Sequence, residues 1–223
     1  MSRTLLPRLD ILPPSQRRLW EELGGLPTAY VLYGGTAIAL HLGHRDSIDF
    51  DFFIAESIDP RRLLDTLPIL RGATVTQMEP ETLSVIVDRD GPIKLSFFGV
   101  PRLGQVREPL RAEENGLAVA DLLDLAGAKV SVVQVRAEPK DYVDIAALLG
   151  AGVELPEMLA AGLAIYGPNF SPQSALKALV YFDDPTLAEL PFTVRHLLRK
   201  AVRSVDMDAL PDVQPRRPRS EGV

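Results

Sequence analysis

The sequence predicts an α+β protein, with a mixed, largely antiparallel sheet flanked by helices and then a helical C-terminal half. Between residues 29 and 100, short apolar runs alternate with turn residues, which is typical of strands. Beyond about residue 119, apolar side chains recur at spacings of three and four, which is typical of helices. With 223 residues, of which 46% are hydrophobic, the chain is long enough to bury a substantial core.

The change of pattern also divides the chain. We expect a sheet-containing core over residues 1–116 and a helical region over residues 117–210 that packs on this core. The proline- and arginine-rich tail, 211–223, is expected to be mobile. The sequence shows no internal repeat, and no long linker separates these parts. One large domain or a domain with a helical extension is therefore expected.

Helix signals mark three segments of the first half. The stretch 15–23 carries an apolar stripe and ends at a glycine pair. A second, shorter helix is expected after another glycine pair, with Thr36 as its cap and Gly43 as its end. A third follows Asp59, because proline occupies its first turn.

Strand-type runs lie around these helices. The stretch 29–33 is short and apolar, and 47–55 alternates with the period of a strand. Turn residues separate three further runs, so an antiparallel meander is expected there. These runs are 73–79, 83–88 and 93–100.

The second half is expected to contain five helices. The first extends from about Val119 to Arg136, and the second follows Pro139 and closes at Gly150. The remaining three cover residues 155–167, 171–182 and 193–203.

Composition excludes several kinds of site. The chain has no cysteine and only three histidines, so any metal ion would be held by oxygen atoms. No apolar run approaches the ~18 residues of a membrane helix, and the first residues lack a secretory signal, so a cytoplasmic protein without a membrane partner is expected. The formal charge of −6 argues against a globally basic nucleic-acid binder, although the stretches 195–203 and 214–220 carry local positive charge.

Two aspartates stand inside an apolar strand-type run, "SIDFDFFIA". In a strand, Asp49 and Asp51 project the same way with Cα atoms roughly 6.5 to 7 Å apart, while Phe50 and Phe52 enter the core. Two ionised carboxylates on one face repel each other, and a divalent cation such as Mg²⁺ relieves that repulsion. The simpler alternative is a strand with one solvated face.

The glycine pair Gly34–Gly35 lies between a strand and a helix. A missing Cβ lets the backbone approach a ligand, and the helix end presents N–H groups to an anion such as a triphosphate. A tight turn alone also explains such a pair. Followed by the D-x-D strand, however, the pair predicts an anion cradle beside a metal site.

Two stretches resemble the AbiEii/AbiGii toxin family of the polymerase-beta-like nucleotidyltransferase superfamily. They are "GGTAIALHLGHRDSIDFDFF" and, over residues 121–149, "DLLDLAGAKVSVVQVRAEPKDYVDIAALL". The resemblance implies a nucleotidyltransferase-like fold and transfer of a nucleoside monophosphate from an NTP to an acceptor hydroxyl. It also implies a toxin of a toxin–antitoxin or phage-defence system, with RNA (tRNA) as an acceptor and a cognate antitoxin protein as a partner.

The resemblance also implies roles for individual residues. Catalytic Mg²⁺ or Mn²⁺ would be bound by Asp49 and Asp51. The residues expected to contact the triphosphate are Gly34, Gly35, Thr36, Arg45 and Ser47. From the second stretch, Lys129 would neutralise charge on the nucleotide, while Asp141 or Asp144 would orient the nucleotide or contact the acceptor.

Ordinary interpretations of the second stretch stay open. Lys129 could lay its stem on apolar surface with its ammonium in water. Arg136, Lys140, Asp141 and Asp144 could form a surface ion-pair cluster.

One departure from the superfamily pattern affects catalysis. Many relatives place a third carboxylate on a later strand, where this chain has Ser96. A catalytically degenerate nucleotide-binding or interaction protein on the same fold is therefore the main alternative function. A D-x-D metal enzyme that uses sugar nucleotides is a third.

Overall fold

The structure is a computed structural model that describes residues 3–216 and divides into two compact units. The first unit contains residues 3–103 and 109–120, and the second contains residues 104–108 and 121–216. The described chain therefore passes between the units three times. The boundary expected at residue 116 precedes the last strand of the first unit, whereas the units change after residue 120.

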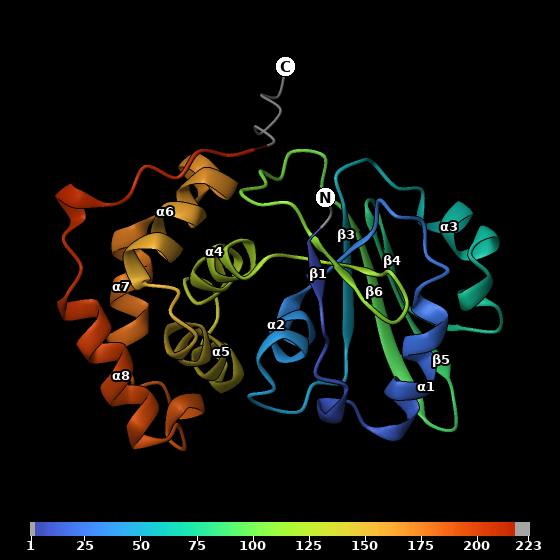
Figure 1. Ribbon diagram of the computed structural model, residues 1–223, viewed down its shortest axis with the longest axis horizontal. Coiled ribbons are helices and arrows are strands. Elements are labelled where there is room, and N and C mark those ends of the chain that lie inside the picture. The colour runs from blue at the N-terminus through green and yellow to red at the C-terminus, as the bar shows by residue number, and fades with distance from the viewer. Residues whose placement is uncertain (1–2, 217–223) are drawn as a thin grey trace. The chain divides into compact units, whose positions relative to one another are not determined.

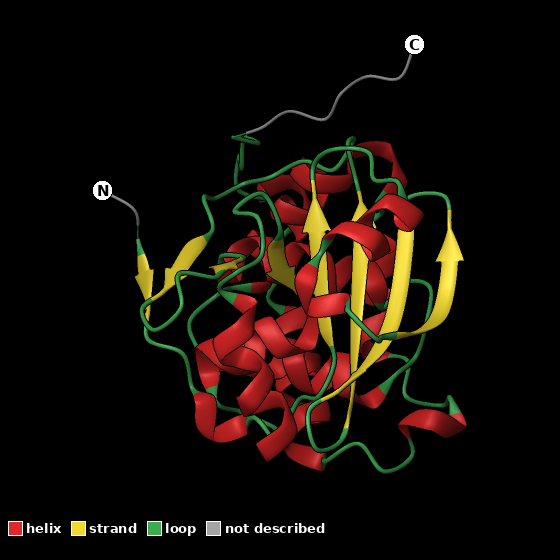
Figure 2. Ribbon diagram, turned by 90° about the vertical axis from the view of Figure 1, so that its right-hand side faces the viewer, coloured by secondary structure: helices red, strands yellow, loops and turns green. Residues whose placement is uncertain are grey.

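An eight-stranded mixed sheet forms the centre of the first unit (Figure 2). Its spatial order is β1-β7-β8-β2-β3-β6-β5-β4. The pairs β1–β7, β2–β8 and β3–β6 are parallel and the others antiparallel, so the predicted mixed sheet and the β4–β5–β6 meander are confirmed. The strands are β1 (Thr4–Leu5), β2 (Val31–Tyr33), β3 (Phe50–Ile54), β4 (Thr74–Glu79), β5 (Thr82–Asp88), β6 (Pro92–Gly99), β7 (Leu110–Ala112) and β8 (Ala118–Val119).

The register of the central strands sets the two faces of the sheet. Phe50 and Phe52 are fully buried on the core face, as their alternation with the aspartates predicts. On the other face, Asp51 pairs with Tyr33 of β2 and with Ser96 of β6. Asp49 precedes β3 by one residue and is half-buried, as is Asp51.

The helices of the first unit are α1 (Pro14–Leu23), α2 (Gly34–Leu42) and α3 (Pro60–Thr66). Asp59 caps α3 as expected, since its carboxylate accepts hydrogen bonds from the first backbone N–H groups of that helix. Gly43 ends α2 in the left-handed conformation, with φ of 64°. The predicted cap at Thr36 is wrong, because the helix already begins at Gly34 after the extended Tyr33.

The second unit is helical (Figure 1). Its helices are α4 (Leu122–Val132), α5 (Pro139–Gly150), α6 (Leu155–Tyr166), α7 (Pro172–Val180) and α8 (Phe192–Arg203). The predicted helix from Val119 to Arg136 is wrong at both ends. Val119 pairs with β2 in the sheet, and Asp121 starts α4 by accepting a hydrogen bond from the N–H of Leu123.

Two further expectations concern the whole chain. Within residues 3–216, no single helix is long and apolar enough to cross a membrane, although α5 and the segment Leu155–Asn169 together meet that criterion across a bend of 117°. Of the tail expected to be mobile, 211–223, residues 217–223 lie outside the described residues. Before them, the backbone N–H of Arg216 donates to the carbonyl of Gln105 at 2.7 Å.

Candidate functional site

Gly34 and Asp51 lie against each other at the end of β2. The register of β2 with β3 brings Tyr33 opposite Asp51, so the residue that follows Tyr33 meets the aspartate side chain. A Cβ on Gly34 would lie 2.7 Å from Oδ2 of Asp51, closer than van der Waals contact permits. Gly34 also has φ of +74°, which side chains disfavour. Glycine is therefore required here both by space and by backbone conformation.

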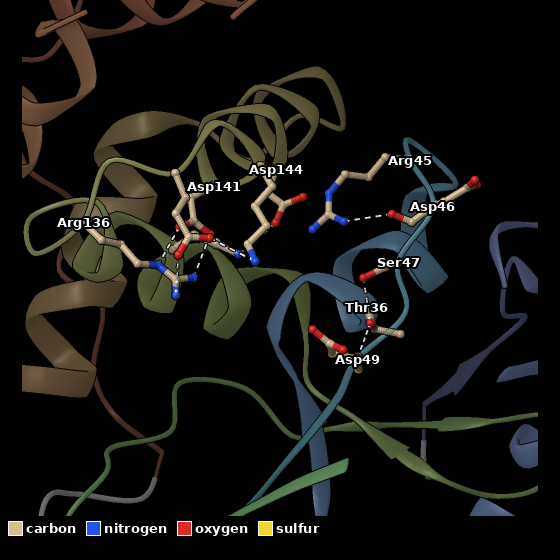
Figure 3. Close-up of polar contacts among 11 residues, drawn as sticks. Thr36, Arg45, Asp46, Ser47, Asp49, Arg136, Asp141 and Asp144 are labelled. Atoms are coloured by element: carbon tan, nitrogen blue, oxygen red, sulfur yellow. Dashed lines mark hydrogen bonds and ion pairs between the residues drawn. The ribbon is translucent and has the colours of Figure 1, made fainter. Parts of the chain in front are cut away.

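A chain of hydroxyl contacts ties the start of α2 to the segment before β3 (Figure 3). The hydroxyl of Thr36 donates to the backbone carbonyl of Asp49, and it lies 2.7 Å from the hydroxyl of Ser47. Thr36 is 2% exposed and Ser47 is 8% exposed. Thr36 thus holds the aspartate backbone instead of capping its helix.

The first turn of α2 contains the residues that the sequence predicts to bind an anion. Gly34, Gly35 and Thr36 are the first three residues of this nine-residue helix, so their backbone N–H groups have no acceptor within the helix. Such an end favours negative charge. Arg45, half-buried beyond the end of α2, donates to the carbonyl of Asp46 at 2.9 Å. The structure therefore gathers the predicted phosphate-binding residues of the first stretch within one unit.

The position beside Asp51 on the neighbouring strand is a serine. Ser96 pairs with Asp51 across β3 and β6, is 2% exposed, and accepts a hydrogen bond from the hydroxyl of Ser84 at 3.2 Å. Among residues 3–216, no group of three or more His, Cys, Asp or Glu side chains is arranged to hold a metal ion. The carboxylates of Asp49 and Asp51 are oxygen donors, which suit Mg²⁺ or Mn²⁺, and Mg²⁺ commonly binds one or two carboxylates together with waters and phosphates.

The second unit contains a buried ion cluster. The ammonium of Lys129 lies 2.6 Å from Oδ1 of Asp141 and 2.8 Å from Oδ2 of Asp144, and neither carboxylate is exposed. The guanidinium of Arg136 also donates to Asp141, from Nε at 2.9 Å (Figure 3). Two cations thus contact the two buried aspartates, and Arg136 also pairs with Glu138 at 3.2 Å. The interpretation with the ammonium of Lys129 in water is wrong, because Lys129 is only 6% exposed. An ion pair of Arg136 with Asp141 does form, but both aspartates are buried and not on the surface.

Asp124 is a buried carboxylate that the sequence did not single out. It accepts hydrogen bonds from the backbone N–H groups of Val106 and Arg107, both at 2.8 Å. Burial raises its pKa to about 6, although these two hydrogen bonds oppose the shift. The negative charge of Asp124 adds to burial in raising the pKa of Tyr166 to about 12. No local pattern reveals this role, since the N–H groups come from a segment 17 and 18 residues away.

The predicted site residues therefore form two groups. Gly34, Gly35, Thr36, Arg45, Ser47, Asp49 and Asp51 belong to the first unit. Lys129, Asp141 and Asp144 belong to the second, where they contact one another directly.

Known structures share this fold. MenT4, a nucleotidyltransferase toxin from Mycobacterium tuberculosis H37Rv, superposes with a TM-score of 0.56 at 15% identity, over 81% of this chain and 77% of that one. An antigenic nucleotidyltransferase-like protein from Paracoccidioides brasiliensis superposes with a TM-score of 0.50 at 17% identity, over 92% of this chain and 98% of that one. The nucleotidyltransferase-like fold that the sequence predicts is thus confirmed.

Sequence comparison identifies the family. An uncharacterised protein of Aquifex aeolicus (strain VF5) is 31% identical over 181 residues, which cover 78% of this chain and 84% of that protein. The family profile described as "Nucleotidyl transferase AbiEii toxin, Type IV TA system" matches residues 18–215. The chain belongs to this family of nucleotidyltransferase toxins of type IV toxin–antitoxin systems.

Proposed function

We propose that the chain transfers a nucleoside monophosphate from an NTP to an acceptor hydroxyl on RNA, such as tRNA, and releases pyrophosphate. The acceptor oxygen forms a bond to the α-phosphorus as the bond to the bridging pyrophosphate oxygen breaks, and the hydroxyl proton leaves to a base. The observation that carries the proposal is the contact of Gly34 with Asp51, which joins the anion cradle to a carboxylate.

In this proposal the first unit binds the triphosphate. Backbone N–H groups of Gly34 and Gly35 donate to phosphate oxygens, and the guanidinium of Arg45 adds positive charge. Asp49 and Asp51 would hold Mg²⁺ or Mn²⁺, which when bound supplies positive charge for the transferring phosphoryl group. Thr36 acts as a positioning residue, because its hydroxyl holds the backbone of Asp49.

The second unit supplies the remaining charges. An ammonium has three N–H donors, and Lys129 gives two of them to Asp141 and Asp144. We propose that Lys129 neutralises charge on the nucleotide, and that Asp141, also held by Arg136, fixes the position of Lys129. We propose that Asp144 orients the acceptor or takes its proton, since Ser96 is no carboxylate base.

Labelled nucleotides test the reaction. We expect purified protein to transfer label from an α-labelled NTP to total tRNA in the presence of Mg²⁺ or Mn²⁺. Asp49→Asn/Asp51→Asn should reduce this transfer at least a thousandfold, because both metal-binding carboxylates are lost. Asp46→Asn is the matched control, since this exposed aspartate lies close in sequence, and it should stay within about twofold of the wild type.

Two results would contradict the proposal. Full transfer by the double variant would remove the carboxylates from the mechanism. NTP binding without transfer by the wild type would support the degenerate alternative that Ser96 favours. A cytoplasmic location and a cognate antitoxin complete the proposal, the second because the family belongs to toxin–antitoxin systems.

A further inference from the structure

Helix α8 of the second unit has two distinct faces. At 100° per residue, Phe192, His196, Arg199 and Arg203 follow one stripe, and Lys200 lies beside it. The apolar side chains project to the opposite side, where Leu198 is fully buried. Phe192, by contrast, is 74% exposed although it is the largest apolar side chain of the helix. The polar stripe therefore faces outward with an aromatic ring at its start.

The charge of α8 is one-sided. The helix carries four basic residues and no acidic one, whereas the whole chain has a formal charge of −6. A face that only keeps a helix soluble generally mixes charges of both signs. A purely cationic helix on an acidic protein instead indicates an anionic partner.

Three of the four cations are available to a partner. Arg195 is held by the carbonyls of Leu190, at 2.8 Å, and Ala188, at 3.2 Å. Within the described part of the chain, no carboxylate forms an ion pair with the other three. These exposed cations are Arg199, Lys200 and Arg203.

Aromatic rings accompany the cations. The guanidinium of Arg199 lies 4.9 Å from the ring centroid of Phe182, which holds it in a cation–π contact. The ring of Phe192 stacks on His196 with centroids 5.9 Å apart and an interplanar angle of 24°. Exposed rings beside ordered cations are typical of surfaces that bind single-stranded nucleic acid, because bases stack on the rings while phosphates meet the cations.

We propose that Phe192, His196, Arg199, Lys200 and Arg203 form an RNA-docking surface, here called the α8 surface. It binds the phosphates of a single-stranded RNA segment through its cations and stacks a base on Phe192. It extends about 17 Å along the helix axis, long enough for several nucleotides. One part of this inference rests on the proposed function, namely that the docked RNA is the acceptor.

Salt-dependent RNA binding tests the cations. The full chain and Arg199→Gln/Lys200→Gln/Arg203→Gln are titrated, without NTP, into a fluorescein-labelled single-stranded RNA of twelve nucleotides at 50 to 200 mM KCl. At 100 mM KCl, we expect the triple variant to bind the RNA about tenfold more weakly than the wild type. Its slope of log K against log salt concentration should be shallower by about 2. Glutamine keeps the helix propensity high, and circular dichroism checks the fold.

A matched control separates local from net charge. Arg61→Gln/Arg62→Gln/Arg71→Gln removes the same charge from exposed residues of the first unit and should change affinity less than twofold. An equal loss in this control, or no loss in the α8 variant, overturns the proposal. If the triple α8 variant unfolds, Arg203→Gln in the exposed last turn replaces it, with a threefold loss expected and no loss overturning the proposal.

Removing the ring tests base stacking. Phe192→Leu keeps an apolar side chain, so we expect about five- to tenfold weaker RNA binding with an unchanged salt slope. The proposal would be overturned if both α8 variants bound RNA as tightly as the wild type but no longer bound a poly-glutamate peptide. That result would assign the surface to an acidic protein. Label transfer is scored separately: RNA binding through α8 without any transfer supports this surface and contradicts only the proposed function.

Discussion

The aspartates of the two units differ in burial and in ion pairing. In the second unit, Asp141 and Asp144 are fully buried, and Lys129 lies within 2.8 Å of both. In the first unit, Asp49 and Asp51 are half-buried, and among the described residues Asp49 forms no ion pair. Burial of a carboxylate without compensation costs several kcal/mol.

The difference lies in which groups of each unit contact the aspartates. The second unit contains counterions for its buried aspartates, because Lys129 contacts both of them and Arg136 contacts Asp141. In the first unit, the hydroxyl of Thr36 holds the backbone of Asp49, and the missing Cβ of Gly34 leaves room for the carboxylate of Asp51. In our proposal, the metal ion and the nucleotide-binding cations complete the electrostatics of that site.

The largest expected effect comes from removing the shared cation of the second unit. Lys129→Met leaves Asp144 without its ammonium and Asp141 with Arg136 alone, so we expect a loss of about 3 to 5 kcal/mol in the free energy of unfolding. Urea denaturation followed by circular dichroism measures it.

Two further variants make that test specific. Lys140→Met removes an exposed lysine of the same helix junction, paired with Glu138 at 2.9 Å, and should cost under about 0.5 kcal/mol. Lys129→Met/Asp144→Asn should recover part of the loss, because one buried negative charge is gone. Equal losses of unfolding free energy for Lys129→Met and Lys140→Met would mean that the buried aspartates do not depend on Lys129.

The next effect concerns Asp124, a buried carboxylate that backbone N–H groups stabilise more than any cation does. The folded pKa of Asp124 is about 6, above the ordinary value of 3.8, so between these values the folded chain binds more protons than the unfolded chain. The stabilisation is present below about pH 4 and is lost as the pH rises through about 6. Relative to Asp124→Asn, we expect wild-type stability to fall by about 3 kcal/mol from pH 4 to pH 7.

Denaturation at several pH values, with the wild type compared to the variant at each, isolates this carboxylate from all others. The variant should itself be destabilised by about 1 to 3 kcal/mol above pH 7, since an asparagine accepts only one of the two N–H bonds at that position. Parallel pH profiles for the two proteins would show that Asp124 titrates normally.

Ligand addition should act on the first unit. Mg²⁺ with ATP at about 100 times its dissociation constant should stabilise the folded protein by about 2.7 kcal/mol, if it binds only the folded state. Asp49→Asn/Asp51→Asn should abolish this stabilisation, while Lys140→Met should retain it. Thermal denaturation with and without ligand measures the effect, and equal stabilisation of the double variant would mean that the aspartates are not its site.

The smallest expected effect isolates the contact at Gly34. Gly34→Ala and Gly116→Ala impose the same backbone strain, since their φ angles are +74° and +73°, but only the first brings a Cβ against Asp51. We expect Gly34→Ala to cost about 1 kcal/mol more stability than Gly116→Ala. It should also reduce label transfer at least tenfold while the control retains it. Identical behaviour of the two variants would remove this contact from the site.

The sequence alone determined the elements with strong local signals. The alternation around Asp51 places Phe50 and Phe52 in the core, and Asp59 starts its helix as a cap. These signals are local, because a strand period or a cap depends on residues within one turn or two pleats. The family resemblance is confirmed as well, since it depends on two motifs that the chain itself contains.

Only the tertiary structure decided how separate segments meet. Pairing of β3 with β6 brings Ser96 beside Asp51, and a segment distant in sequence supplies the N–H groups that Asp124 accepts. The prediction of a helix cap at Thr36 is wrong for the same reason, because the hydroxyl of Thr36 donates a hydrogen bond to the backbone of Asp49 and not to its own helix. Such contacts depend on strand register and packing across long sequence separations, which local patterns of side chains do not encode.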